Sequence, residues 1–178
     1  MSDAPSSVRL VAHDPAWAAR FAEERARLRD ALGALPAEIA HVGSTAVPGL
    51  VAKPILDLLV GRPAGNVAPY VDALVRAGYV HRGEAGLPGR HYFRRGDPRT
   101  HHLHLVEIDG PYWRDHLAFR DRLRADPALA AAYGALKTRL AARHADDRAA
   151  YTEAKAPFIT AVLRGALLPT IEPADGSP

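Results

Sequence analysis

Residues 41–60 contain the residue types needed to bind phosphate groups and a divalent cation. Gly43 and Ser44 follow a short apolar run, and such a turn presents backbone N–H groups and a hydroxyl that suit phosphate oxygens. Asp57 lies inside a second apolar run, where a charge is costly unless it binds something. One lysine, Lys53, lies between the two. The stretch therefore predicts a site for a nucleotide and a divalent cation.

Two histidines on a later segment have the spacing to join that site. His102 and His104 are two residues apart in a predicted strand, so their side chains share one face. Beside the strand of Asp57 they would form an Asp/His/His cluster. Carboxylate and imidazole are both ligands for transition metals, and imidazole titrates near neutral pH. The alternative interpretation is that the histidines are hydrogen-bonded structural residues and that Asp57 is a buried salt-bridge partner.

Lysine is rare in this chain, which has Lys53, Lys137 and Lys155 among 23 basic residues. Lys53 precedes the strand of Asp57 and could neutralise a phosphate, whereas the other two could reach the same cleft from the C-terminal half. Each could instead be a surface residue whose aliphatic stem packs on its helix. Four arginines near the histidine-rich strand could bind phosphate or equally protect a solvated hairpin edge. These are Arg90, Arg94, Arg95 and Arg99.

The composition is that of a soluble globular protein with one domain. The 178 residues suffice for a proper core, and the 48% hydrophobic and 24% charged residues are ordinary values. The absence of cysteine excludes disulfides, thiolate catalysis and cysteine-based zinc sites. A net charge of +3 without a polybasic run does not indicate nucleic-acid binding. We expect a cytoplasmic protein, because no apolar run approaches the roughly 20 residues of a membrane span and no signal peptide is evident.

Hydrophobic periodicity predicts an α+β fold. Strands are predicted over 8–11, 38–42, 55–60, from 79, and over 91–94 and 101–107. Helices are predicted from Asp14-Pro15 to Gly33, over 66–77, from Trp113 to about 141 with a new start at Asp126-Pro127, and over 149–168, where Pro157 should start a turn or a kink. The result is a mixed sheet of four to five strands flanked by helices, followed by a helical C-terminal half.

The same patterns define the expected domain organisation. We expect a disordered N-terminus over 1–7, one domain over 8–168, and a flexible tail over 169–178, which is rich in proline, glycine and acidic residues. Within the domain, 8–110 would contain the sheet and 111–168 the helical half.

Motifs spread over most of the chain resemble those of the GrpB family. They are HVGSTAVPGLVAKPILDLLV (41–60), the pair Gly78-Tyr79, RTHHLH (99–104), LAFRDRLRADP (117–127), AAYGALKTRLA (131–141) and YTEAKAPFI (151–159). The resemblance runs from about Val8 to Leu168. It implies a nucleotidyltransferase-like fold of the polymerase-β superfamily. Similar segments are also fused to the C-terminal end of dephospho-CoA kinase in some bacteria.

The resemblance also implies roles for single residues. Members of that superfamily carry Gly-Ser, then a strand with two alternate carboxylates, and a third carboxylate on a neighbouring strand. Gly43 and Ser44 match the Gly-Ser pair, and Asp57 matches the first carboxylate, a metal ligand. The sequence departs from the pattern at Leu59, where the second carboxylate should stand. His102 and His104 occupy the region of the third.

The leading hypothesis is a metal-dependent nucleotidyltransferase-like enzyme that uses a nucleoside triphosphate and a small-molecule acceptor. Asp57, His102 and His104 would be its catalytic and metal-binding residues, with Mg²⁺ or Mn²⁺ as cofactor and Zn²⁺ as the alternative. The nucleotide would be bound by Gly43, Ser44, Thr45, Lys53 and Lys155. Two alternatives remain: a degenerate module that binds a nucleotide or coenzyme without chemistry, and a metal-dependent hydrolase or other small-molecule enzyme that uses the Asp/His/His cluster.

Overall fold

The structure is a computed structural model that describes residues 8–169. The predicted disordered N-terminus and all but the first residue of the predicted tail lie outside this range. In chain order the elements are α1 (Ala16–Leu32), β1 (Glu38–Val42), the short 3-10 helix η1 (Ser44–Ala46), β2 (Leu56–Arg62), α2 (Ala68–Arg76), β3 (Val80–His81), β4 (His91–Arg95), β5 (His101–Glu107), α3 (Pro111–Ala125), α4 (Pro127–Arg143), α5 (Arg148–Glu153) and α6 (Ala156–Arg164).

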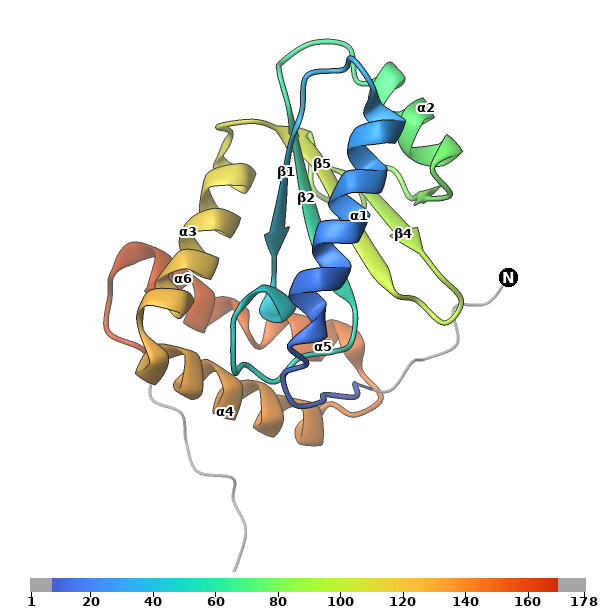
Figure 1. Ribbon diagram of the computed structural model, residues 1–178. Helices are drawn as coiled ribbons and strands as arrows, with labels where there is room; N and C mark the ends of the chain where they lie inside the picture. Colours follow the sequence, from blue (N-terminus) through green and yellow to red (C-terminus); the bar gives the residue numbers. More distant parts are fainter. Residues whose placement is uncertain (1–7, 170–178) are drawn as a thin grey trace, which may run out of the picture.

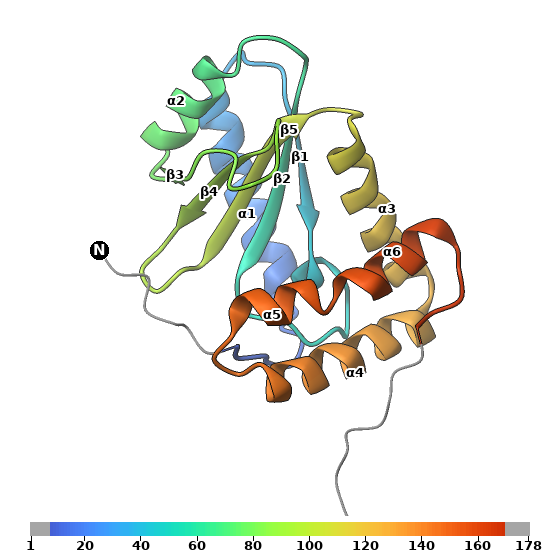
Figure 2. The same ribbon diagram turned by 180° about the vertical axis from the view of Figure 1, so that it is seen from behind.

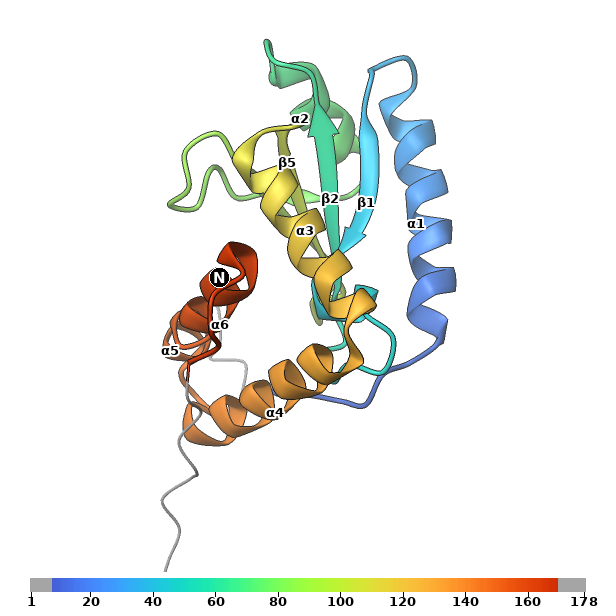
Figure 3. The ribbon, with the colours of Figure 1, turned by 90° about the vertical axis from the view of Figure 1, so that its left-hand side faces the viewer.

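Within the described range, five strands form one mixed sheet in the order β1-β2-β5-β4-β3, which confirms the predicted α+β fold (Figure 1). β2 and β5 are parallel neighbours, and the other pairs are antiparallel. Figure 3 shows the sheet nearly edge-on, with α1 on one side and α3 on the other. From behind, α5 and α6 lie across the α3 side, and α4 runs beneath the end of the sheet (Figure 2).

The main core lies between the sheet and the pair α1 and α2. Alternate residues of the central strands point to this face, as the period of a strand requires. They are Leu56, Leu58 and Val60 of β2, Leu103 and Leu105 of β5, and Phe93 of β4. Trp17 and Leu28 of α1 and Leu74 of α2 complete the core and are at most 2% exposed.

The opposite face of the sheet has a smaller apolar patch and carries Asp57. Val42, Leu59 and Val106 pack there against Trp113 of α3. Gly61 allows this contact, because a Cβ at that position would lie 2.7 Å from the Trp113 ring. Leu59 is fully buried. The position at which the resemblance implies a second carboxylate is therefore part of the core.

The helical half packs on the loop after β1, and two of its helices, α4 and α5, have side-chain N-caps. Asp126 accepts a hydrogen bond from the Leu129 N–H and begins α4, as predicted, and Asp147 caps α5 in the same way. Apolar side chains of α3, α4 and α6 pack with Val47 and Leu50. None of the helices within residues 8–169 combines the length and apolar character that a membrane span requires.

Three predicted elements need correction. Residues 8–11 are not a strand, because the Val8 N–H bonds to Ala145 O and only Val11 pairs, in an isolated bridge with Ala52. The predicted helix over 149–168 is two helices, since Pro157 lies in the first turn of α6. β2 extends past the predicted end to Arg62, because β5 continues beside it.

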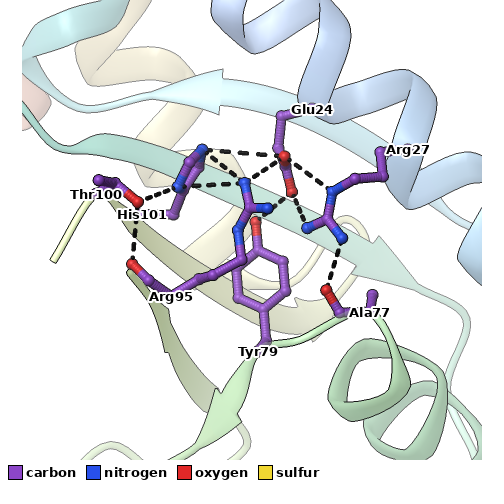
Figure 4. A network of polar contacts seen from close by, with 7 residues as sticks. All are labelled: Glu24, Arg27, Ala77, Tyr79, Arg95, Thr100 and His101. Atoms are coloured by element: carbon purple, nitrogen blue, oxygen red, sulfur yellow. Dashed lines mark hydrogen bonds and ion pairs between the residues drawn. The ribbon is translucent and has the colours of Figure 1, made fainter. Parts of the chain in front are cut away.

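A polar cluster on the α1 side of the sheet joins α1 to β4 and β5 (Figure 4). Glu24 is only 5% exposed and accepts hydrogen bonds from Arg27, from Arg95 and from the Tyr79 hydroxyl at 2.7 Å. Arg95 also lies 3.0 Å from Nε2 of His101. His101 therefore lies on the α1 side of the sheet, away from Asp57.

Candidate functional site

A cavity of about 320 Å³ lies between the sheet and the helical half, where β1 ends and β2 and β5 begin. The sheet contributes Asp57, His102 and His104, and the turn after β1 contributes Gly43 and Ser44. The helices contribute Tyr112 and His116 of α3, Lys137 of α4, and Arg148, Tyr151 and Thr152 of α5. The cavity is thus shared by segments that lie far apart in the sequence.

The structure brings all the predicted site residues together around this cavity. They are Gly43, Ser44, Thr45, Lys53, Asp57, His102, His104 and Lys155. The four arginines considered above are not among its lining residues in the described part of the chain. Arg94 is in register with His102 and shares its face of the sheet. Arg95, the next residue of the strand, points to the opposite face and pairs with Glu24.

Asp57 and His102 form the centre of the site. They are direct neighbours across the parallel pair β2 and β5, and Nδ1 of His102 lies 2.9 Å from Oδ1 of Asp57. Burial raises the pKa of the Asp57 carboxyl, but the hydrogen bond from His102 and nearby positive charges outweigh it and hold that pKa below its ordinary value. Asp57 is therefore an ionised carboxylate at neutral pH, with 30% of its side chain exposed.

Gly43 is required by its close approach to Asp57. Its φ is +70°, a region that favours glycine. A Cβ at this position would lie 2.5 Å from Oδ2 of Asp57 and 2.9 Å from its Cβ. The backbone of the turn after β1 therefore contacts the carboxylate directly.

We expect Gly43→Ala to destabilise the protein more than Gly49→Ala does. Gly49 has a similar φ of +76°, but a Cβ there meets nothing within 4 Å. Both variants carry the backbone strain, but only Gly43→Ala adds the overlap with Asp57. This overlap should lower the free energy of unfolding by about 1–3 kcal/mol more. Urea unfolding of the two variants measures the difference. Equal losses would show that the turn relaxes freely away from Asp57.

His104 has partners of its own and is kept neutral. Its Nδ1 lies 3.1 Å from the Tyr112 hydroxyl, and its ring stacks on Tyr92 at 5.2 Å. Burial lowers the pKa of His104 to about 3. Within residues 8–169, no group of three or more histidine, aspartate or glutamate side chains is arranged to hold a metal ion. The Asp/His/His metal cluster therefore stays a prediction without geometric support.

Thr45 and His41 are bonded to each other beside the cavity. Nε2 of His41 lies 2.9 Å from the Thr45 hydroxyl, and both side chains are buried. Burial lowers the pKa of His41 to about 4, so the ring is neutral at pH 7. Thr45 thus stabilises the turn through its side chain, while Ser44 faces the lysine of α4.

All three lysines of the chain line this cavity. Lys137 is only 2% exposed and donates to Oγ of Ser44 at 2.8 Å and to Val51 O. The ammonium groups of Lys53 and Lys155 lie 4.7 and 4.4 Å from the centre of the Tyr151 ring. Burial is the largest cause that lowers the pKa of each lysine, to about 7 for Lys137 and about 8 for Lys53.

The cavity has a strong excess of positive charge. Arg148 joins the three lysines, and Asp57 is the one carboxylate among the described lining residues. An anionic ligand suits this arrangement. The rarity of lysine was the sequence signal for Lys137, whereas no signal distinguished Arg148, Tyr112 or His116 from other surface or core residues.

Solved structures with a similar fold were found by comparison. A crystal structure of the conserved protein GrpB from Enterococcus faecalis matches with a TM-score of 0.78 and 40% identity, over 88% of this chain and 96% of that one. The Cid1 poly(U) polymerase, in a structure with Mg and 3′-dATP bound, matches with a TM-score of 0.54 and 15% identity. That match covers 83% of this chain and 50% of Cid1. The fold is therefore nucleotidyltransferase-like.

Curated proteins with similar sequences also cover most of this chain. The chain is 40% identical to the UPF0157 protein YqkA of Bacillus subtilis, over 85% of this chain and 45% of that protein, so it spans less than half the length of that relative. It is 35% identical to the glutamate-rich protein GrpB of Alkalihalophilus pseudofirmus, over 86% of this chain and 92% of that protein. A dephospho-CoA kinase of Mycolicibacterium paratuberculosis shares 31% identity, over 92% of this chain and 47% of the kinase.

The GrpB family model matches residues 7–165. This range includes the turn after β1, both strands of the Asp57–His102 pair and all three lysines. The chain belongs to the GrpB protein family.

Proposed function

We propose that the protein binds a nucleoside triphosphate in this cavity and transfers its nucleotidyl group to a small-molecule acceptor. The observation that supports this most is the position of Asp57. It lies against a glycine–serine turn, in a cavity with three lysines and an arginine, within a nucleotidyltransferase-like fold. Cid1, which shares that fold, has Mg and 3′-dATP bound in one of its structures.

The phosphates would lie between the glycine–serine turn and the lysines. Ser44 accepts a hydrogen bond from Lys137 through its oxygen, so its own O–H is able to donate to a phosphate oxygen. Lys53, Lys155 and Arg148 also line the cavity and would neutralise the remaining phosphate charge. Binding would thus be dominated by charge-assisted hydrogen bonds.

The donor set fits a cation that the nucleotide itself helps to hold. Asp57 offers an ionised carboxylate, and Mg²⁺ or Mn²⁺ commonly combines one or two carboxylates with substrate phosphates. When bound, such a cation would neutralise the charge that develops on the reacting phosphate. Leu59 is buried and offers no second carboxylate, so the protein side of the site is built for one such ligand.

His102 is the better placed of the two histidines to accept a proton from the acceptor. Its Nδ1 is fixed by Asp57, and its Nε2 is buried with no hydrogen-bond partner among the described residues. A histidine oriented by a carboxylate in this way suits general-base catalysis. His104 is a weak base at neutral pH, because its pKa is about 3.

Leu59 favours one alternative function, the binding of a nucleotide or coenzyme without chemistry. Two-metal phosphoryl transfer uses several carboxylates to hold both ions, and this chain presents one. The two functions differ only in whether a product forms.

Nucleotide binding and product formation test the proposal together. Calorimetry with the four nucleoside triphosphates and Mg²⁺ should show saturable binding, and mass spectrometry should show a nucleotidylated product in a panel of small acceptors. Lys155→Met should weaken binding roughly 10- to 100-fold, because one charge-assisted contact is lost. Arg143→Met, on an exposed part of α4 outside the cavity, should leave binding unchanged.

The results of these two measurements distinguish the transferase from the binding module. Binding without any product would support the binding module and reject the transferase. Absence of saturable nucleotide binding would reject both.

A further inference from the structure

The convergence of the lysines is unusual for this chain. Only three of its 23 basic residues are lysines, yet Lys53 from the loop before β2, Lys137 of α4 and Lys155 between α5 and α6 line one cavity. The two residue types differ chemically, because arginine keeps its charge in proteins whereas a buried lysine readily loses its proton. The choice of lysine at all three positions therefore points to a property that arginine would not supply.

None of these ammonium groups has an ionic partner within residues 8–169. Lys137 donates to a hydroxyl and a carbonyl, both neutral, and Lys53 and Lys155 lie against the same ring of Tyr151. Asp57 is the one carboxylate lining the cavity among these residues, and His102 already occupies one of its oxygens. The three lysines thus share one carboxylate, Asp57, and an anionic ligand would supply the negative charge that this carboxylate does not.

We infer that the cavity takes up protons when it binds a di- or triphosphate group, so that its affinity for polyphosphate falls as the pH rises above neutral. This inference rests on the proposed position of the nucleotide phosphates and adds a regulation of that site. The titratable and charged groups that face the lysines come from every surrounding element. They are Asp57 of β2, Arg99 before β5, His102 and His104 of β5, Tyr112 and His116 of α3, Tyr133 of α4, and Arg148 and Tyr151 of α5.

The direction of the effect follows from the burial and mutual repulsion of the lysines. Burial, followed by nearby positive charges, lowers the pKa of Lys53 to about 8, and burial, followed by Lys155, lowers the pKa of Lys137 to about 7. Near pH 8 both are therefore partly neutral in the free protein. A polyphosphate beside them favours the charged form and raises each pKa, so protons are taken up on binding.

Calorimetry with inorganic tripolyphosphate, without metal, tests the inference. At pH 8, titrations in two buffers of different ionisation enthalpy report the protons taken up, and we expect on the order of 0.5–1 proton per ligand. The second terminal phosphate of tripolyphosphate also ionises above neutral pH, so the share of Lys53 is taken as the difference in proton uptake between the unaltered protein and Lys53→Arg, in which the ligand is the same. Between pH 7 and pH 9 the dissociation constant should rise at least about tenfold, since each linked proton changes it tenfold per pH unit.

Arginine variants distinguish the effect of the positive charge from the effect of proton uptake. Lys53→Arg keeps the positive charge and cannot release it, so it should still bind tripolyphosphate, with reduced proton uptake and a flatter pH dependence. Lys137→Arg tests the buried position if the variant folds. Arg143→Lys, on the exposed end of α4, is the matched control and should behave as the unaltered protein.

Failure of this inference and failure of the proposed function give different results. Tripolyphosphate binding with proton uptake, but without nucleotide binding, would support the lysine inference and reject the transferase. Nucleotide turnover without proton uptake, or with an affinity that is constant from pH 7 to 9, would reject only the inference. Absence of tripolyphosphate binding would reject it as well.

Discussion

Asp57→Asn should lower Mg²⁺- or Mn²⁺-dependent nucleotide turnover by at least about 100-fold while leaving the fold intact. The amide has the size of the carboxylate and still accepts a hydrogen bond from His102, whose Nδ1 lies 2.9 Å from Oδ1. It lacks the negative charge that would hold a divalent cation. The loss should therefore appear mainly in turnover, as measured by pyrophosphate release. The melting temperature should fall only modestly, because the folded protein loses a carboxylate whose lowered pKa stabilises it at neutral pH.

The same variant should bind nucleotide without metal at least as tightly as the unaltered protein. Asp57 is the one negative charge among the described lining residues, and its removal leaves the lysines and Arg148 facing the phosphates. The matched control is Asp72→Asn, since Asp72 is exposed on α2. Unchanged turnover in Asp57→Asn would refute the proposed role of this carboxylate.

Glu24→Ala should produce the largest loss of stability, about 3 kcal/mol or more of the free energy of unfolding. Removal of one partner from a buried ionic cluster leaves the others uncompensated, which typically costs about 3–5 kcal/mol. We expect the lower end of this range, because the side chains of Arg27 and Arg95 are 39% and 26% exposed and can gain some hydration. For a domain of this size, each kcal/mol lowers the melting temperature by roughly 2–4 °C.

The neighbouring residue supplies the control for this prediction. Glu23 is exposed on the same helix, so Glu23→Ala should change stability by less than about 0.5 kcal/mol. Glu24→Gln should lie between the two, since its one carbonyl oxygen can replace either Oε1, which accepts from Tyr79, or Oε2, which accepts from Arg95, and the charge is lost. Equal stabilities of the Glu23 and Glu24 variants would show that the cluster in Figure 4 contributes nothing net.

Glu24 should also contribute to acid unfolding. Burial raises the pKa of its carboxyl, but the hydrogen bonds from Arg27 and Tyr79 and the charge of Arg95 outweigh it, so the pKa in the folded protein is below the ordinary value. The stabilisation is therefore complete above pH values of about 4.3, the ordinary glutamate pKa, and is lost as the pH falls through the lower folded pKa. Glu24→Gln should lack this part of the acid dependence.

Local patterns in the sequence determined the elements and the first half of the site. The alternation in 101–107 placed His102 and His104 on one face, and both line the cavity in the structure. The Asp126-Pro127 pair gave the start of α4, and the isolated carboxylate in an apolar run identified Asp57. These signals are readable because helix caps and strand periodicity depend on residues only a few positions apart.

Tertiary structure alone decided which of these side chains meet. The parallel pairing of β2 with β5 placed His102 against Asp57, and the packing of the C-terminal helices on the segment between β1 and β2 placed Lys137 beside Ser44 and Lys53 beside Tyr151. The antiparallel register of β4 on β5 directed Arg95 to Glu24, away from the cavity. No local pattern encodes such contacts, because they depend on the closure of long loops and on the complementarity of buried surfaces that are distant in the chain.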